Sequence, residues 1–144
     1  PMIPPEKMIN RLSTLYAGSS QTGSLEIVKG ILETALSRIG YDQILYLEVN
    51  EDNNPRRSFD INMYRAKVRL EDLHPLLLRM CRHFSISPER FHALYDPVKS
   101  KRFGHLSGGI DREGKDFLTV YYGVEEHPKE AVPRSPDRAG QETS

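Results

Sequence analysis

Polar and aromatic side chains alternate along two predicted hairpins of this 144-residue chain, and they are its best candidates for contact with a ligand or partner. Carboxylate, amide, imidazole and hydroxyl groups can exchange hydrogen bonds or a proton with a ligand, and phenol rings can stack on it. Because side chains alternate with period two along a strand, we expect these residues to share one sheet face. They are Tyr46, Glu48, Asp60, Asn62, Tyr64, His105 and Ser107, with Arg65 and Lys67 near the end of the same predicted strand.

The role of this face depends on what covers it. Antiparallel sheets often leave one face to water, and the residues would then be ordinary surface residues. If a partner sheet or a second copy covers the face, they form a polar pocket with aromatic walls. Both interpretations stay open at the level of sequence.

Other chemical motifs give little support for catalysis. The five histidines form no HExxH motif and no pair four residues apart, so we expect no zinc site. The segment 104–109 is neither a nucleophile elbow nor a P-loop, and its glycines predict a bulge or a close backbone approach. The single cysteine, Cys81, is expected to be a small buried side chain. We therefore expect no metal, no cofactor and no catalytic residue, and we lean towards a protein that is not an enzyme.

Charge is balanced in total but uneven along the chain. Residues 56–102 hold 11 basic and 5 acidic side chains, whereas residues 1–55 hold 4 and 7 and residues 103–126 hold 2 and 5. This +6 segment between two −3 segments could attract an anionic small molecule or pair copies head to tail. Nucleic-acid binding through the basic middle is a weaker alternative, and a solvated helix face is the common explanation of such runs.

Two further features concern location. The longest apolar runs fall well short of the ~20 residues of a membrane span, so no membrane contact is expected. The segment 1–7 has no signal-peptide core, and this indicates a cytoplasmic protein.

The elements that must position these residues repeat along the chain. Apolar spacing and turn residues predict helix, helix, strand, strand, twice, and Leu25-Glu26 and Leu70-Glu71 open one helix in each copy. Ser24 is the expected cap of the second helix, and Gly40 is expected to end it. Pro75 suits only a first helical turn, and Ser87-Pro88 begins the last helix. The predicted strands are 44–49, 58–68, 103–110 and 117–122, the last of them central because it is apolar on both faces.

This order predicts an α+β domain. We expect a four-stranded antiparallel sheet built from two ααββ units, with the helices on one face. Phe59, Ile61 and Met63 should point into the core. The domain should cover residues 1–126, with a pseudo-repeat of 6–68 and 70–124, and 127–144 should be a disordered tail.

The two hairpins resemble those of the αββα aromatic prenyltransferases. The resemblance rests on 44–49 with 58–63, and on Gly108-Gly109-Ile110-Asp111 with 117–122. That family closes five such units into a ten-stranded barrel with outer helices and a polar, aromatic-lined lumen. The resemblance thus implies that two units supply four of ten strands, and it assigns no catalytic residue here.

These observations lead to one main hypothesis and two alternatives. The main one is a non-enzymatic cytoplasmic binding or assembly module that contacts another protein or a second copy of itself through the polar sheet face and the basic middle. A small enzyme or ligand-binding protein with a prenyltransferase-like pocket on that face is the first alternative. Nucleic-acid binding is the second.

Overall fold

The computed structural model describes residues 3–17, 23–50 and 57–123. Its four longer helices are α1 (Pro5–Tyr16), α2 (Gly23–Leu36), α3 (His74–His83) and α4 (Pro88–Tyr95). Its strands are β1 (Leu45–Asn50), β2 (Arg57–Asn62), β3 (Phe103–Ile110) and β4 (Asp116–Tyr122). Three short 3-10 helices are η1 (Tyr41–Gln43), η2 (Tyr64–Ala66) and η3 (Leu70–Leu73).

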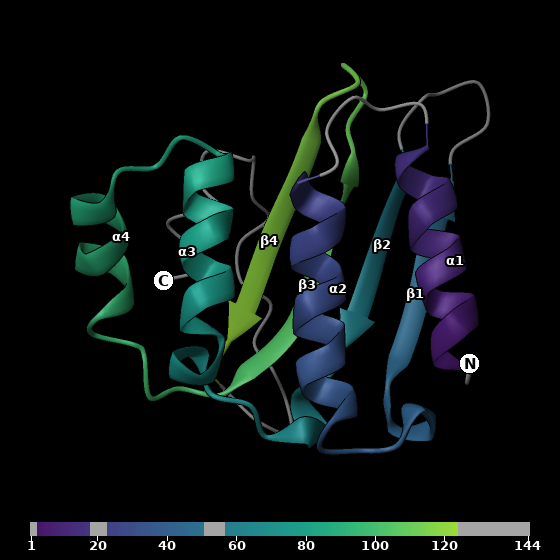
Figure 1. Ribbon diagram of the computed structural model, residues 1–144, viewed down its shortest axis with the longest axis horizontal. Coiled ribbons are helices and arrows are strands. Elements are labelled where there is room, and N and C mark those ends of the chain that lie inside the picture. Colours follow the sequence, from purple (N-terminus) through teal and green to yellow (C-terminus); the bar gives the residue numbers. More distant parts are fainter. Residues whose placement is uncertain (1–2, 18–22, 51–56, 124–144) are drawn as a thin grey trace.

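The strands form one antiparallel sheet in the order β1-β2-β3-β4. In Figure 1, α1, α2 and α3 lie side by side over one face of this sheet, and α4 lies beyond α3. The predicted class is therefore confirmed: an α+β fold with a four-stranded antiparallel sheet and helices on one face. We call the helix-covered side the inner face and the opposite side the distal face.

The core lies between the inner face and the three helices. Phe59, Ile61 and Met63 are all buried there, as their alternation predicts. They pack in one cluster with apolar side chains from every longer helix, which gives each amphipathic helix a surface on which to bury its apolar stripe.

Local capping signals predict some helix ends and not others. Pro75 lies in the first turn of α3, and the Ser87 side chain accepts a hydrogen bond from the Arg90 amide at the start of α4, both as predicted. The predicted cap at Ser24 is wrong, because α2 already includes Gly23 and the Ser24 hydroxyl bonds elsewhere. The predicted stop at Gly40 is also wrong, because α2 ends at Leu36 and Gly40 has an ordinary φ of −73°.

The second strand ends earlier than its sequence suggests. β2 stops at Asn62, and the chain then turns through η2 to Lys67, which has a left-handed φ of 56°. The prediction that placed Tyr64, Arg65 and Lys67 on this strand is therefore wrong. Apolar and polar residues still alternate through this segment. The backbone hydrogen bond from the Ala66 amide to the Met63 carbonyl, however, closes a turn and does not extend the pairing of β2 with its neighbours.

The position of the last strand also differs from expectation. β4 forms one edge of the sheet, although residues 116–120 are all buried. Burial on both faces is therefore not evidence for a central strand here. The prediction assumed that a strand buried on both faces must also have a neighbouring strand at both edges. Burial of the faces and pairing at the edges are separate properties.

Candidate functional site

The distal face carries some, but not all, of the polar residues that the sequence predicts to lie together. Directly opposed residues in antiparallel strands point to the same face, so the register places Asp60 and Asn62 of β2 beside Ser107 and His105 of β3. The neighbouring strand β4 adds Thr119 and Tyr121, opposite Ser107 and His105. Four of the seven residues predicted to share this face do so: Asp60, Asn62, His105 and Ser107.

Tyr46 and Glu48 lie on the opposite side of the sheet from that prediction. They face Ile61 and Phe59 across the β1–β2 register and therefore point to the inner face. The Tyr46 hydroxyl donates to Glu48 Oε2 at 2.5 Å, and burial, followed by this hydrogen bond, raises the pKa of Tyr46. Tyr46 is buried in the core and Glu48 is half-buried beside it, so neither residue contributes to the distal face.

A histidine, a carboxylate and a phenol meet at the centre of the distal face. His105 Nδ1 lies 2.8 Å from Asp60 Oδ1, and the imidazole stacks on the Tyr121 ring with centroids 4.2 Å apart and planes 7° apart. Because an ionised carboxylate can only accept, it holds the proton of a neutral imidazole on Nδ1 and leaves Nε2 as an acceptor. The arrangement holds the imidazole against an aromatic wall and leaves Nε2 as the ring nitrogen that does not contact Asp60.

Glycines allow the strands around this cluster to approach closely. Gly109 has a φ of +139°, and a Cβ there would lie 2.1 Å from the Arg57 carbonyl oxygen. A Cβ at Gly108 would lie 2.7 Å from the Phe117 carbonyl oxygen. The prediction that these glycines mark a close backbone approach is confirmed, and their role is structural.

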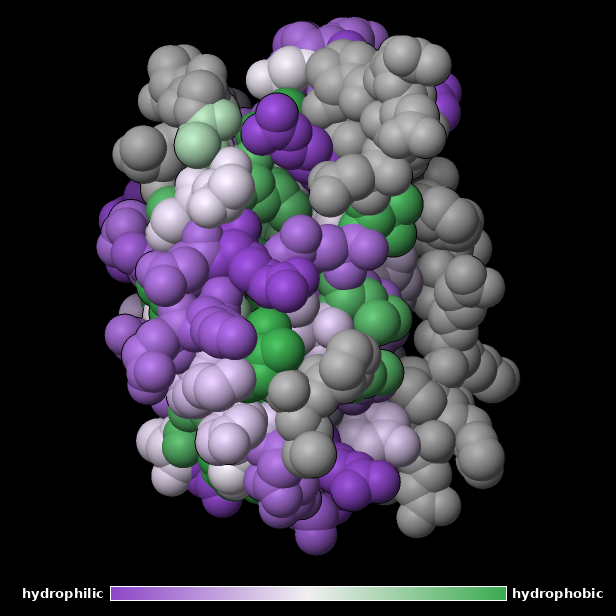
Figure 2. All heavy atoms as spheres, turned by 90° about the vertical axis from the view of Figure 1, so that its right-hand side faces the viewer, coloured by the Kyte–Doolittle hydropathy of each residue, from purple (hydrophilic) through white to green (hydrophobic). Residues whose placement is uncertain are grey.

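An apolar stripe runs along the β1 edge of the distal face. Leu45, Leu47 and Val49 are 45%, 46% and 57% exposed, and three such side chains in a row on one strand face form a contiguous apolar patch. They alternate with the inward-facing Tyr46 and Glu48, and within the described sheet β1 pairs with β2 alone. Figure 2 views the molecule from the side on which β1 and α1 lie, and hydrophobic atoms reach the surface there between hydrophilic residues. This stripe was not predicted from the sequence, although apolar residues alternate along 45–49.

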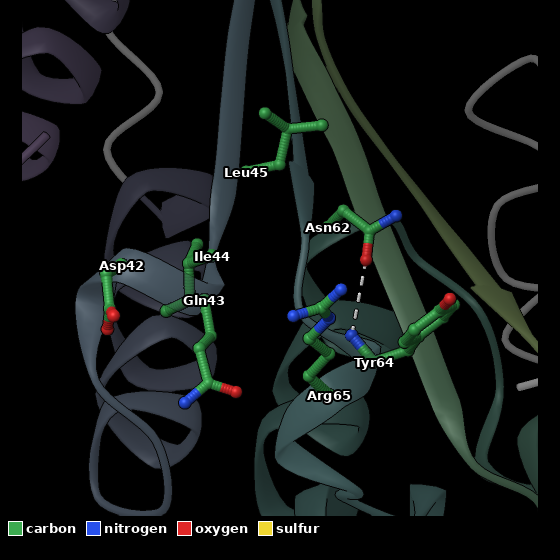
Figure 3. Close-up of a pocket in the computed structure, with 7 residues that line it drawn as sticks. All are labelled: Asp42, Gln43, Ile44, Leu45, Asn62, Tyr64 and Arg65. Carbon is green, nitrogen blue, oxygen red and sulfur yellow. Dashed lines mark hydrogen bonds between the residues drawn. The ribbon is translucent and has the colours of Figure 1, made fainter. Parts of the chain in front are cut away.

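A shallow pocket opens where the first hairpin meets η1 and η2. Its volume is about 330 Å³. Figure 3 shows residues of η1 on one side of the gap and residues from the end of β2 and from η2 on the other. It brings together three of the predicted site residues, Asn62, Tyr64 and Arg65, and the Asn62 side-chain oxygen accepts a hydrogen bond from the Tyr64 amide at 3.3 Å. The lining is completed by Asp42, Gln43, Ile44 and Leu45.

Some of the basic residues in 56–102 lie close together in the fold and others lie apart. An isolated β-bridge joins Arg69 to Arg102, and the Leu70 amide donates to the Lys101 carbonyl, so two basic runs lie side by side. We call Lys67, Arg69, Lys99, Lys101 and Arg102 the basic patch. Arg57 lies at the opposite end of β2, and Arg56 lies outside the described residues.

A buried polar cluster joins α2, α3 and β4. The Ser24 hydroxyl donates to Asp116 Oδ2, and His83 Nε2 lies 2.5 Å from the same oxygen. The Tyr16 hydroxyl is buried beside them, and burial, followed by the charge of Asp116, raises its pKa. Sequence reasoning missed this cluster because its members are up to 92 positions apart. Its carboxylate also lies at the positive end of the α2 dipole, so it serves to hold three elements together.

Three further observations limit the chemistry of the described segments. Within residues 3–17, 23–50 and 57–123, no group of three or more His, Cys, Asp or Glu side chains is arranged to hold a metal ion. No helix in those same ranges is both long and apolar enough to cross a bilayer. Cys81 is buried as predicted, and burial raises its pKa to about 11.

Comparison with known proteins gives no assignment. No protein-family model matches the chain, and neither the curated proteins nor the solved structures provide a significant match.

Proposed function

We propose that this protein is a non-enzymatic cytoplasmic binding or assembly module that works through the distal face and the edge strand β1. The observation that carries the proposal is the exposed stripe of Leu45, Leu47 and Val49 on a strand that pairs on one side only within the described sheet. An edge strand offers backbone donors and acceptors to an added strand. Exposed aliphatic side chains beside that edge supply apolar area for the same contact.

The edge has few of the features that usually protect a strand from pairing. Its six residues include no proline, lysine or arginine. Its one charged side chain, Glu48, points to the inner face, where it accepts a hydrogen bond from Tyr46 of the same chain. The other edge, β4, has Phe117 and Thr119 buried on the distal side, so it offers less free apolar surface. These contrasts favour β1 as the contact edge. The basic patch is a second contact region in this proposal and would attract an anionic group.

A strand-forming peptide tests the proposal directly. We expect a labelled peptide of alternating valine and threonine to bind the full chain saturably, measured by fluorescence anisotropy. Leu47→Lys should weaken this binding on the order of tenfold or more, because it places a charge in the apolar contact. Ala93→Lys on α4 is the matched control, since it adds the same side chain and the same charge at an exposed helix position. The proposal fails if no strand peptide binds and the chain does not associate with itself at any concentration.

A second candidate is a ligand-binding protein or small enzyme with a prenyltransferase-like pocket on the distal face. It is favoured by the cluster of Asp60, His105 and Tyr121, which presents a fixed acceptor nitrogen beside an aromatic ring. Such a cluster needs a cover to exclude water, and closure of the sheet into a barrel by further strands would supply one.

A thermal-shift series with prenyl diphosphates tests this second candidate. A ligand at 100 times its Kd should stabilise the fold by about 2.7 kcal/mol. His105→Phe keeps a ring on Tyr121 and removes the acceptor nitrogen, so it should abolish a shift that depends on this site. If no prenyl diphosphate raises the melting temperature of the unmodified chain, the second candidate is wrong.

A further inference from the structure

We propose that the partner of β1 is the β1 strand of a second copy, paired antiparallel about a two-fold axis through Leu47. This inference rests on the proposed function and names its partner. A two-fold axis perpendicular to the sheet keeps both distal faces on the same side and makes one continuous sheet of eight strands. Both sets of helices then lie together on the opposite side.

The residue pattern of β1 is self-complementary in this register. Pairing about Leu47 places Leu47 opposite its own copy and Leu45 opposite Val49, all on the distal face. Cross-strand apolar pairs of this kind are the contacts that stabilise a sheet. Each of the three exposed apolar side chains thus acquires an apolar partner.

The register centred on Leu47 pairs all three exposed aliphatic side chains, and its neighbours do not. Centring the pair on Tyr46 would place Leu45 opposite Leu47 but Val49 opposite Gln43. Centring the pair on Glu48 would place two carboxylates opposite each other, which is destabilising. Centring it on Leu45 would place Leu47 opposite Gln43 and Val49 opposite Tyr41, so the aliphatic pairs are lost. With Leu47 at the centre, Glu48 instead lies opposite Tyr46, the phenol that already donates to it within one chain.

The expected complex is weak and depends on concentration. The contact consists of two six-residue strands and three aliphatic side chains from each copy. Interfaces at the low end of the size range are typical of transient association. We therefore expect monomer at low micromolar and dimer at high micromolar concentration.

Cysteine cross-linking tests both the partner and the register in the full chain. Opposed residues have Cα atoms about 4.5–5.5 Å apart, inside the Cα range of a disulfide, so Leu47→Cys should oxidise to a covalent dimer. Two copies of position 49 would lie roughly 13 Å apart, four residues along a strand, so Val49→Cys alone should cross-link on the order of tenfold more slowly. A mixture of Leu45→Cys and Val49→Cys proteins should cross-link to each other. The native Cys81 is buried, so the unmodified chain is the blank.

The outcomes separate this inference from the proposed function. Preferential cross-linking at 47, with Leu47→Lys monomeric and equally folded by circular dichroism, supports the two-fold dimer. A chain that stays monomeric, or a dimer in which positions 47 and 49 cross-link alike, overturns it. If the valine–threonine peptide still binds in that case, the proposed function stands and only the identity of the partner is wrong.

Discussion

At the scale of single residues, Asp116 is the side chain on which the packing of three elements depends. Its carboxylate accepts a hydrogen bond from Ser24 and lies 2.5 Å from His83 Nε2, and only 10% of its side chain is exposed. Asp116→Ala would leave the buried Ser24 and the half-buried His83 without this acceptor. We expect it to lower the free energy of unfolding by about 1–3 kcal/mol in urea titrations. Glu113→Ala, in the exposed hairpin turn, should change it by less than about 0.5 kcal/mol. Equal losses for the two variants would contradict the structural role of the cluster.

Cys81 gives a pH prediction at the same scale. Burial raises the pKa of its thiol from 9.0 to about 11. Below pH 9 the folded and unfolded chains both keep the proton, whereas between pH 9 and 11 mainly the unfolded chain releases it, so stability falls as pH rises. We expect the difference in unfolding free energy between the unmodified chain and Cys81→Ala to shrink by about 1–2 kcal/mol over this window. A difference that stays constant with pH would show that the thiol titrates alike in both states.

At the scale of secondary-structure elements, the β2–β3 ladder depends on Gly109. Its φ of +139° and the 2.1 Å separation of a Cβ from the Arg57 carbonyl oxygen leave no room for a side chain. We expect Gly109→Ala to lower the unfolding free energy by more than about 2 kcal/mol, because it combines strain with a backbone clash. Gly114→Ala is the matched control, since its φ of +84° carries the strain but nothing lies within 4 Å. It should cost only about 1 kcal/mol, measured by thermal and urea unfolding. Similar losses would mean that the close approach is absent.

Much of the element pattern was predictable because it depends on local signals. The bounds of β3 match the prediction, and Ser87 caps α4 as its sequence suggests. The end of β2 was not predictable from alternation, since the segment 63–68 keeps a strand-like pattern while its backbone turns. The face of Tyr46 was also ambiguous, because a phenol suits either face and only the pairing with Ile61 decides it.

At the scale of the whole molecule, association through β1 needs a folded chain whose contact edge is exposed. Leu47 is 46% exposed on the distal face, so Leu47→Lys should change the unfolding free energy of the monomer by less than about 1 kcal/mol. The same substitution should abolish concentration-dependent association in sedimentation velocity. A variant that unfolds would show that Leu47 supports the core, and one that still associates would place the contact elsewhere.

The candidate site was only partly predictable because it depends on tertiary contacts. Alternation correctly predicted that His105 and Ser107 share one sheet face, and that Asp60 and Asn62 do too. The approach of Asp60 to His105 joins residues 45 positions apart, and it follows from the pairing of β2 with β3 across the intervening helices. The prenyltransferase-like resemblance, the pseudo-repeat and the nucleic-acid alternative stay predictions, and the predicted tail at 127–144 lies outside the described residues.

Hydrogen exchange of the β1 backbone amides shows whether β1 is the contact edge of the molecule. We expect amides within Leu45–Asn50 to exchange on the order of tenfold more slowly as protein concentration rises or as the valine–threonine peptide is added. The backbone N–H groups that point away from β2 would then be hydrogen-bonded to the added strand. Amides of the hairpin turn 111–115 should not change, and Leu47→Lys should remove the effect. If the exchange rates of the β1 amides do not change with either concentration or peptide, β1 is not the edge through which the molecule binds its partner.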